Sequence, residues 1–344
     1  MATDEVDVGK RFLECKTRRD VAVALNITYS RLTWQLYKDP KKYITFHIPK
    51  KSGGTRRIHA PTPVLKKTQR KLQGLLESIY KPRPSVHGFV SNRSILSNAK
   101  HHCRKKFVLN VDLKEFFPSI HLGRIRGLLI AVPYGMDPDV ATVIAQLCCR
   151  DGILPQGAPT SPIISNMICA KMDSKLQGIA RKYKCLYTRY ADDLTFSTRE
   201  PKFPDALAFV EFVDGKKKAR VGPVLRDVIE VNGFRVNENK IRLQTNQARQ
   251  MATGLVINDR PNVRRRFVMQ IRGMLHVWQL HGPEYAEAVF QSTYRNHKYR
   301  NPSKTETTFQ AVLLGKISFL GMVKGKKNKV YLKYLNWFKR LPGL

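Results

Sequence analysis

Apolar residues recur along this chain with two spacings, and the mixture predicts both helices and strands. A spacing of three to four residues, typical of amphipathic helices, occurs at 17–38, 63–80, 122–131, 138–149, about 162–182 and 223–232. Short runs of β-branched and aromatic residues, typical of strands, lie at 43–49, 107–112, 185–190, 194–197, 234–243 and 252–257. Because helices and strands do not alternate strictly, the pattern favours an α+β fold over a doubly wound sheet.

A basic turn follows the first predicted strand. Residues 43–49 are β-forming, and the next eight residues combine Gly53 and Gly54 with two lysines and two arginines. Glycines between two β-forming segments predict a hairpin. We therefore expect a hairpin whose tip carries a rim of positive charge.

Two stretches leave alternatives open. The interval 200–222 contains Lys216-Lys217-Lys218 and is either a partner-facing loop or a solvated insertion; we favour the insertion. The last quarter, from Leu255 to Leu344, is predicted to be mostly helical. Its aromatic residues are either helix core or a stacking surface for nucleic acid: Trp278, Tyr294, Tyr299, Tyr331, Tyr334, Trp337 and Phe338.

The net charge narrows the class of partner. Lys and Arg number 62 against 26 Asp and Glu, which gives a formal charge of +36. A positive field of this size attracts polyanions and binds phosphates through counterion release. Nucleic acid, the ribosome and acidic membranes all fit, and we favour nucleic acid. The last quarter has 17 Lys and Arg against four Asp and Glu, so its basic character is pronounced.

The cysteines and the hydropathy point to a protein of a reducing compartment. The six cysteines form no CxxC pair and have no histidine at metal spacing, so we interpret them as small buried hydrophobes. The acidic N-terminus does not resemble a signal peptide, and no apolar run reaches the length of a membrane span. We expect a cytoplasmic protein with no membrane partner.

Three aspartates are the candidates for catalysis. Asp192 and Asp193 lie between two predicted strands, and Asp112 ends another. Carboxylates gathered at strand ends repel one another unless a cation lies between them, and Mg²⁺ is a hard cation that prefers such oxygens. Two such ions can support in-line phosphoryl transfer. An isolated Asp-Asp pair is more often a surface turn, so the assignment depends on its context.

That context is a series of five segments whose order and spacing resemble the retroelement reverse transcriptases. The segments are 48–58, 112–120, 155–162, Tyr190-Ala191-Asp192-Asp193 and 233–240, and the resemblance covers residues 43 to 258. The resemblance implies an α+β right-hand polymerase with fingers, a palm of antiparallel sheet plus helices, and a helical thumb. It divides the chain into an N-terminal helical extension (1–42), fingers (43–105), palm (106–258, with part of the fingers interleaved around 122–165) and a thumb with an RNA-binding C-terminal region (259–344).

The resemblance also assigns roles at the catalytic centre. Asp112, Asp192 and Asp193 would hold two Mg²⁺ ions, and the Val111 carbonyl is a further candidate ligand. Lys240 is a candidate proton donor to the leaving pyrophosphate.

The dNTP site follows from the same motifs. Phe117 matches the steric-gate aromatic that collides with a ribose 2′-OH; the alternative is a core phenylalanine, a role that Phe116 could fill instead. Gln156 and Gly157 would let the backbone approach the base pair closely. The triphosphate would be clamped by hairpin cations, for which an ordinary exposed basic turn is the alternative: Lys50, Lys51 and Arg56.

Two further segments resemble the retron enzymes within that family. Asn98-Ala99-Lys100-His101-His102 fits an N-A-x-x-H element directly after His87-Gly88-Phe89-Val90. Ala252-Thr253-Gly254 stands where these enzymes carry V-T-G, although the alanine departs from that pattern. Retron enzymes recognise a structured noncoding RNA, prime from a guanosine 2′-OH and make branched msDNA. They act in defence against bacteriophage beside an effector protein.

The resemblance therefore implies a cognate RNA, its msDNA product, dNTPs and an effector protein as partners. The candidate RNA-binding residues are Asn98, His102, Thr253, Gly254, Arg264, Arg265, Arg266, Arg272, Lys326 and Lys327. Basic helices suit RNA recognised by shape and backbone, although a generic thumb for any template–primer duplex remains an alternative. Two other functions stay open: a group II-like reverse transcriptase that extends ordinary 3′ primers, and a non-catalytic RNA-binding scaffold.

Overall fold

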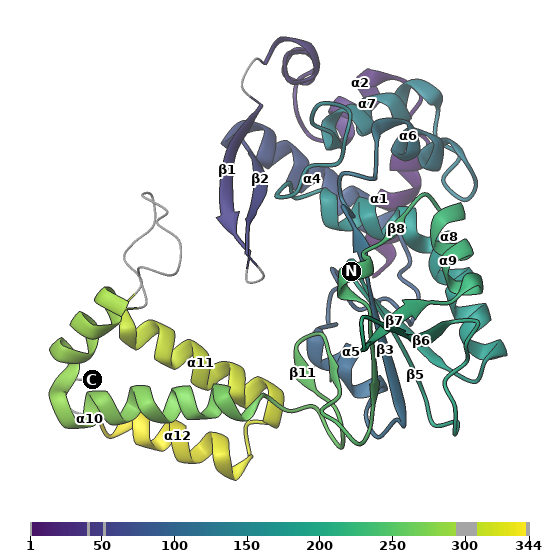
Figure 1. Cartoon of the computed structure of the whole chain (residues 1–344). Coiled ribbons are helices and arrows are strands. Elements are labelled where there is room, and N and C mark those ends of the chain that lie inside the picture. Colours follow the sequence, from purple (N-terminus) through teal and green to yellow (C-terminus); the bar gives the residue numbers. More distant parts are fainter. Residues whose placement is uncertain (1, 40–41, 51–52, 294–307, 342–344) are drawn as a thin grey trace.

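The structure is a computed structural model that describes residues 2–39, 42–50, 53–293 and 308–341. In Figure 1, helices gather at the top, a sheet lies below them, and a separate group of helices stands at the lower left. None of the helices in these ranges combines the length and apolar character that crossing a membrane requires.

The first helices are part of the main core. They are α1 (Ala2–Leu13), α2 (Arg18–Ala24), α3 (Tyr29–Thr33) and the π-helix η1 (Trp34–Lys38). Thr17 caps α2 in a reciprocal arrangement with Asp20, which satisfies backbone donors at the helix start. Phe12, Val21 and Leu25 are at most 1% exposed, so these helices are packed against the rest of the fold.

The predicted basic hairpin is present. Strand β1 (Tyr43–Pro49) pairs antiparallel with β2 (Thr55–Pro61), and Pro49 lies opposite Thr55 at the tip. Arg150, which follows α7 (Pro138–Cys148), donates to Thr45 on β1 and contacts His59 on β2. This arginine fastens the base of the hairpin to the helical layer.

An antiparallel sheet of five strands forms the centre of the fold. Strand β3 (Phe107–Lys114) pairs on one side with β5 (Asp193–Thr198), which pairs with β4 (Leu186–Tyr190). On its other side β3 pairs with β9 (Arg242–Thr245) and β8 (Arg235–Val236), and the 3₁₀ turn η2 (Glu238–Lys240) lies between them. The two-residue period of β3 sends Leu109, Val111 and Leu113 into the main core and Val108 into a second one.

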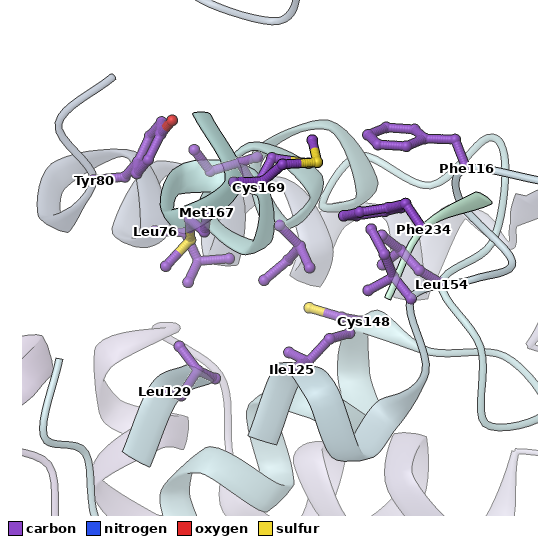
Figure 2. Packing of buried hydrophobic residues seen from close by; sticks show 14 of the residues in the cluster. Leu76, Tyr80, Phe116, Ile125, Leu129, Cys148, Leu154, Met167, Cys169 and Phe234 are labelled. Carbon is purple, nitrogen blue, oxygen red and sulfur yellow. The ribbon is translucent and has the colours of Figure 1, made fainter. Parts of the chain in front are cut away.

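The main core is built where helices meet the sheet. It involves α4 (Pro63–Ile79), α6 (Leu122–Ile130), α8 (Ser161–Lys182) and α9 (Pro223–Val231). Figure 2 shows Leu76 of α4, Ile125 and Leu129 of α6, and Met167 of α8 packing in this core. All six cysteines are free; five are buried and Cys103 is partly buried, which agrees with the hydrophobic role we expected.

The interval 200–222 contains a hairpin, a regular structure that neither alternative for this stretch anticipated. Strand β6 (Ala208–Val213) pairs with β7 (Lys216–Val221) through Asp214 and Gly215, both at positive φ. Asp-Gly between two β-forming runs is a strong hairpin signal because both turn positions need positive φ. The Asp-Gly signal was present in the sequence, but the three lysines that follow it favoured a solvated insertion instead of a strand.

The second core belongs to the C-terminal part. A tight hairpin, β10 (Met251–Ala252) and β11 (Leu255–Val256), leads to α10 (Arg265–Thr293), α11 (Phe309–Lys324) and α12 (Lys329–Lys339). Non-helical φ and ψ at Gly282, followed by Pro283, break α10. Of the aromatic residues expected to be either helix core or a stacking surface, Trp278, Tyr334 and Phe338 are buried in the core. Tyr331 and Trp337 pack beside it, and Tyr294 and Tyr299 lie outside the described residues.

Candidate active site

Strand register brings the three aspartates together. In the β3–β5 pair, Asp112 lies directly opposite Asp193, and the Leu113 amide donates to the Asp192 carbonyl over 3.0 Å. In the β4–β5 pair, Tyr190 lies opposite Asp193, so Ala191 and Asp192 form a two-residue turn. Two segments that are distant in the sequence therefore present their carboxylates side by side, where β3 ends and β5 begins. The Val111 side chain is buried beneath them.

The turn adopts a backbone conformation that its surroundings support. Ala191 has φ +56°, which costs energy for a residue with a Cβ. Its carbonyl accepts a hydrogen bond of 3.2 Å from Arg189 Nη1. Behind the turn, a Cβ on Gly88 would lie 2.3 Å from the Ala191 nitrogen, so only glycine permits this approach.

A wholly buried ion pair lies under the same turn. Arg189 and Asp173 have side chains that are 0% exposed. The guanidinium bonds both carboxylate oxygens of Asp173, at 2.8 and 2.7 Å, and the Asn166 Oδ1 at 3.0 Å. The Tyr187 hydroxyl donates to Asp173, and Asn166 donates to the Gly88 carbonyl. Sequence reasoning missed this network; an arginine inside a predicted buried strand was the available signal, since arginine is seldom buried without a partner.

The electrostatics of the aspartates favour a bound cation. Burial, Asp192 and Asp112 raise the pKa of Asp193 to about 6, and burial and Asp112 raise the pKa of Asp192. Asp112 accepts hydrogen bonds from Asn237 Nδ2 over 2.9 Å and from Lys240 Nζ over 2.8 Å. Asn237 lies within the segment 233–240, in which the resemblance assigned a role only to Lys240.

The donor set fits a hard divalent ion. Three carboxylates and a strand carbonyl are the oxygen ligands that Mg²⁺ prefers, and their mutual repulsion is what a cation would relieve. Among the residues described, no three His, Cys, Asp or Glu side chains already converge on one point, and both oxygens of Asp112 are engaged by Asn237 and Lys240. Asp112, Asp192, Asp193 and the Val111 carbonyl are the groups that would hold the metal.

Phe116 and Phe117 lie in the turn that follows β3, and they differ in exposure although their ring centroids are only 5.2 Å apart. Phe116 is 4% exposed and stacks on Phe234 with ring centroids 5.6 Å apart. Phe117 is partly exposed and lines a pocket of about 420 Å³, with Phe89 6.3 Å away between ring centroids. The core role therefore belongs to Phe116, and Phe117 is available to a ligand.

The same pocket reveals cations that sequence reasoning missed. Lys66 and Arg70, one helical turn apart on α4, line it together with Gly157. Gly157 has φ +123°, and a Cβ there would lie 3.0 Å from the His59 carbonyl oxygen of β2. The Gln156 carbonyl accepts from the His59 amide over 2.9 Å. Gly157 therefore lies close to the backbone of β2, and the loop that contains Gln156 and Gly157 is packed against the basic hairpin.

The hairpin cations lie on its exposed end. Lys50 and Arg56 are exposed. Burial raises the pKa of Asp192 overall, and the positive charge of Arg56 opposes part of that rise. Arg56 therefore lies within electrostatic range of the aspartates. Lys51 lies outside the described residues. The clamp remains a prediction.

The expected RNA contacts of Asn98 and His102 need correction. Both residues are 0% exposed, so their side chains offer no surface to RNA. Burial lowers the pKa of His102 to about 3, and the neutral ring bonds Ser197 Oγ of β5 and Thr188 Oγ1 of β4, each over 2.7 Å. His102, at the end of α5 (Ile95–His101), thus joins that helix to both strands of the aspartate hairpin.

The remaining candidates lie on the surface. Thr253 and Gly254 form the β10–β11 turn at positive φ, and Thr253 Oγ1 donates to the Ile95 carbonyl of α5 over 3.0 Å. The other basic candidates are all exposed: Arg264, Arg265, Arg266, Arg272, Lys326 and Lys327. Their role in RNA binding stays a prediction.

Comparison with known proteins decides the family. The family described as "Reverse transcriptase (RNA-dependent DNA polymerase)" matches residues 48–265, which include all three aspartates. The chain belongs to the reverse transcriptases. Its relatives further place this enzyme in the retron type, and its antiparallel sheet with a helical C-terminal part agrees with the expected α+β right-hand fold.

Three retron relatives illustrate the similarity. The chain is 38% identical to the retron Mx65 reverse transcriptase of Myxococcus xanthus over 76% of its own length and 62% of the relative's. It is 32% identical to the retron Mx162 reverse transcriptase of the same organism, covering 94% of this chain and 67% of the relative. It is 31% identical to the retron Ec86 reverse transcriptase of Escherichia coli, covering 75% and 76%. The chain thus spans a little under two thirds of the length of the Mx65 relative.

Proposed function

We propose that this enzyme copies a cognate structured noncoding RNA into DNA by nucleotidyl transfer on two Mg²⁺ ions. The observation that carries the proposal is the strand register that places Asp112 opposite Asp193 beside Asp192. Raised pKa values at Asp192 and Asp193 support cation binding there. When bound, two such ions activate the attacking hydroxyl and stabilise the leaving oxygen.

The surrounding residues would bind and orient the dNTP. Lys50 and Arg56 would clamp phosphate oxygens, Lys50 as a point charge and Arg56 as a planar fork. Lys66 and Arg70 add positive charge to the lining of the Phe117 pocket. Lys240, whose Nζ contacts Asp112, would give a proton to the leaving pyrophosphate. These cations together would hold the substrate against the aspartates.

The finer retron activity also belongs to this proposal. Priming from a guanosine 2′-OH, a branched msDNA product, an effector protein and a role against bacteriophage are supported by the similarity to the retron reverse transcriptases. The test is to purify the enzyme from cells that carry its flanking DNA and to sequence the nucleic acid that copurifies. A short DNA joined to RNA by a 2′,5′ branch supports the proposal; an ordinary 3′ linkage favours a group II-like enzyme.

Shortening Phe117 should admit ribonucleotides. The ring of Phe117 lines the pocket, so Phe117→Val opens space where a 2′-OH would otherwise collide. We expect the preference for dNTP over NTP, measured as the ratio of kcat/KM values in primer extension, to fall about tenfold or more. Phe212→Val, at a 71% exposed position on β6, is the control. Unchanged sugar discrimination in Phe117→Val would reject the gate.

Removing Arg264, Arg265 and Arg266 should weaken RNA binding by an electrostatic mechanism. For each phosphate that the protein no longer neutralises, the negative slope of log affinity against log salt concentration becomes shallower by about 0.7 to 1. We expect the triple alanine variant to show a flatter slope in filter binding with a synthetic RNA stem-loop. The matched variant, Lys216-Lys217-Lys218 to alanine, removes the same charge from β7. Equal slopes in the wild type and the arginine variant would move the RNA site elsewhere.

A further inference from the structure

A second pocket lies between α5 and the turn that connects α11 to α12. Its volume is about 270 Å³, and its lining includes Leu96 and Lys100 of α5, Arg260 from the segment before α10, and Lys324, Gly325 and Asn328 at the turn. This pocket shares no residue with the one that contains Phe117. It also leaves out the arginines 264–266, so neither the dNTP site nor the basic start of α10 accounts for it.

Three cations from three separate segments converge on this pocket. Lys100, Arg260 and Lys324 line it, and no carboxylate does. The nearest acid in the sequence, Asp259, is bonded instead to Arg104 over 2.7 Å. Within the described ranges, the structure pairs none of the three lining cations with an acid. Positive charges brought together in this way repel one another unless an anion lies among them.

The environment of Lys324 agrees with this crowding of positive charge. Burial, and after it the charge of Arg260, lower the pKa of the Lys324 ammonium. Lys324 is also the last residue of α11, so the helix holds its backbone in place. An anion in the pocket would remove the conflict between Lys324 and Arg260.

Two features suit a phosphate group attached to a nucleoside. The pocket borders the start of α12, where Asn328 Oδ1 accepts from the Val330 amide, and helix starts favour anions. Its remaining walls are apolar, with Leu96, Pro261, Met322 and Val323. Cations for a phosphate beside an apolar wall for a sugar or base match one residue of a polynucleotide better than a small inorganic anion.

We propose that this pocket binds one backbone phosphate of the RNA and so joins α5 to the C-terminal helices through the nucleic acid. The occupant, though not the existence of an anion site, rests on the proposed function. The phosphate would touch cations from both sides of the junction. Because α5 is joined through His102 to the strands of the aspartate hairpin, the bound RNA would be anchored close to the catalytic sheet.

The test compares two charge-matched double variants of the full chain. Lys100→Gln with Lys324→Gln removes two lining cations, whereas Lys333→Gln with Lys339→Gln removes two exposed lysines of α12 outside the pocket. Filter binding of a synthetic RNA stem-loop is measured across a salt series. We expect the pocket variant to lose about tenfold or more in affinity and to flatten the salt slope by about one unit, with the α12 variant close to wild type.

Two further measurements keep the outcomes distinct. Inorganic phosphate should raise the melting temperature of the wild type more than that of the pocket variant. Without an anion, the pocket variant should melt no lower than the wild type, which shows that it folds. Equal salt slopes for the two double variants overturn the proposal. Phosphate stabilisation that depends on the pocket, with an unchanged RNA slope, overturns RNA as its occupant. Primer extension on a DNA-primed template, at saturating template, tests the polymerase activity separately.

Discussion

Changing Asp192 and Asp193 together to asparagine should abolish DNA synthesis while RNA binding survives. Asparagine keeps the size of each side chain but removes the negative charge that would hold the metal ions. Two-metal catalysis contributes several kcal/mol to transition-state stabilisation, so we expect the rate of primer extension with Mg²⁺ to fall more than about a thousandfold. Asp227→Asn, at an exposed position on α9, is the control for loss of a carboxylate elsewhere.

The same double variant should be more stable than the wild type when metal is removed. Burial and neighbouring aspartates raise the pKa of Asp193 to about 6, from the 3.8 of an ordinary aspartate. A raised pKa means that the folded chain disfavours the carboxylate, so the free energy of unfolding rises as the pH falls from 7 through about 6. At neutral pH, asparagine at both positions should add roughly 1–2 kcal/mol, measured by denaturant titration with a chelator. Primer extension by the double variant would contradict the metal assignment, and a flat pH profile for the wild type would contradict the raised pKa of Asp193.

Replacing Arg189 by lysine should impair catalysis more than it impairs folding. Arginine alone can bond both oxygens of Asp173 and, with its remaining nitrogen, Asn166 and the Ala191 carbonyl. Lysine keeps the buried charge paired but no longer holds the left-handed turn. Because a displacement of about 1 Å near the reacting groups can cost a hundredfold in rate, we expect kcat to fall by about that factor. The KM for dNTP should change little.

Arg189→Met would leave Asp173 charged and unpaired in the interior, at a cost of about 3–5 kcal/mol, so it is the less informative substitution. Asn166→Ala provides a second variant, since it keeps the ion pair and removes the link from Arg189 to the carbonyls of Gly88 and Phe89. Arg220→Lys, at the partly exposed pair with Glu211, is the control. If Arg189→Lys melts lower but its folded fraction has the wild-type kcat and the wild-type Mg²⁺ requirement, the network has only a structural role.

Local signals predicted the elements of this fold well. The helices at 63–79, 122–130 and 138–148 and the strands at 43–49 and 107–114 begin and end close to their expected limits, because hydrophobic period and turn residues act over short distances. The span 17–38 instead forms the separate helices α2, α3 and η1, and 252–257 contributes to the short β10–β11 hairpin. The β6–β7 hairpin was missed altogether. Its Asp-Gly turn is a local signal too, but Phe209, Val210 and Phe212 are exposed, so the strands lack the buried face that makes alternation visible.

The site was predictable in its residues and not in its supports. Asp112, Asp192 and Asp193 stood in recognisable segments, and the structure joins them through the β3–β5 register. Asn98 and His102 stood in an equally recognisable segment, yet they are buried. A motif records that a residue type is needed at a position; it does not say whether the side chain meets a ligand or the interior, because that depends on what packs over it.

By itself, the sequence determined the family, the three aspartates, the strand-and-helix plan and the positive field that favours nucleic acid. Only the tertiary structure decided which partners surround those residues. Three features join residues from separate elements: the Arg189–Asp173 ion pair, the hydrogen bonds of His102 to β4 and β5, and the pocket lined by Lys100, Arg260 and Lys324. The physical reason is range: periodicity and turn chemistry act within a few residues, whereas a buried charge or a cation cluster is defined by neighbours that only folding brings together.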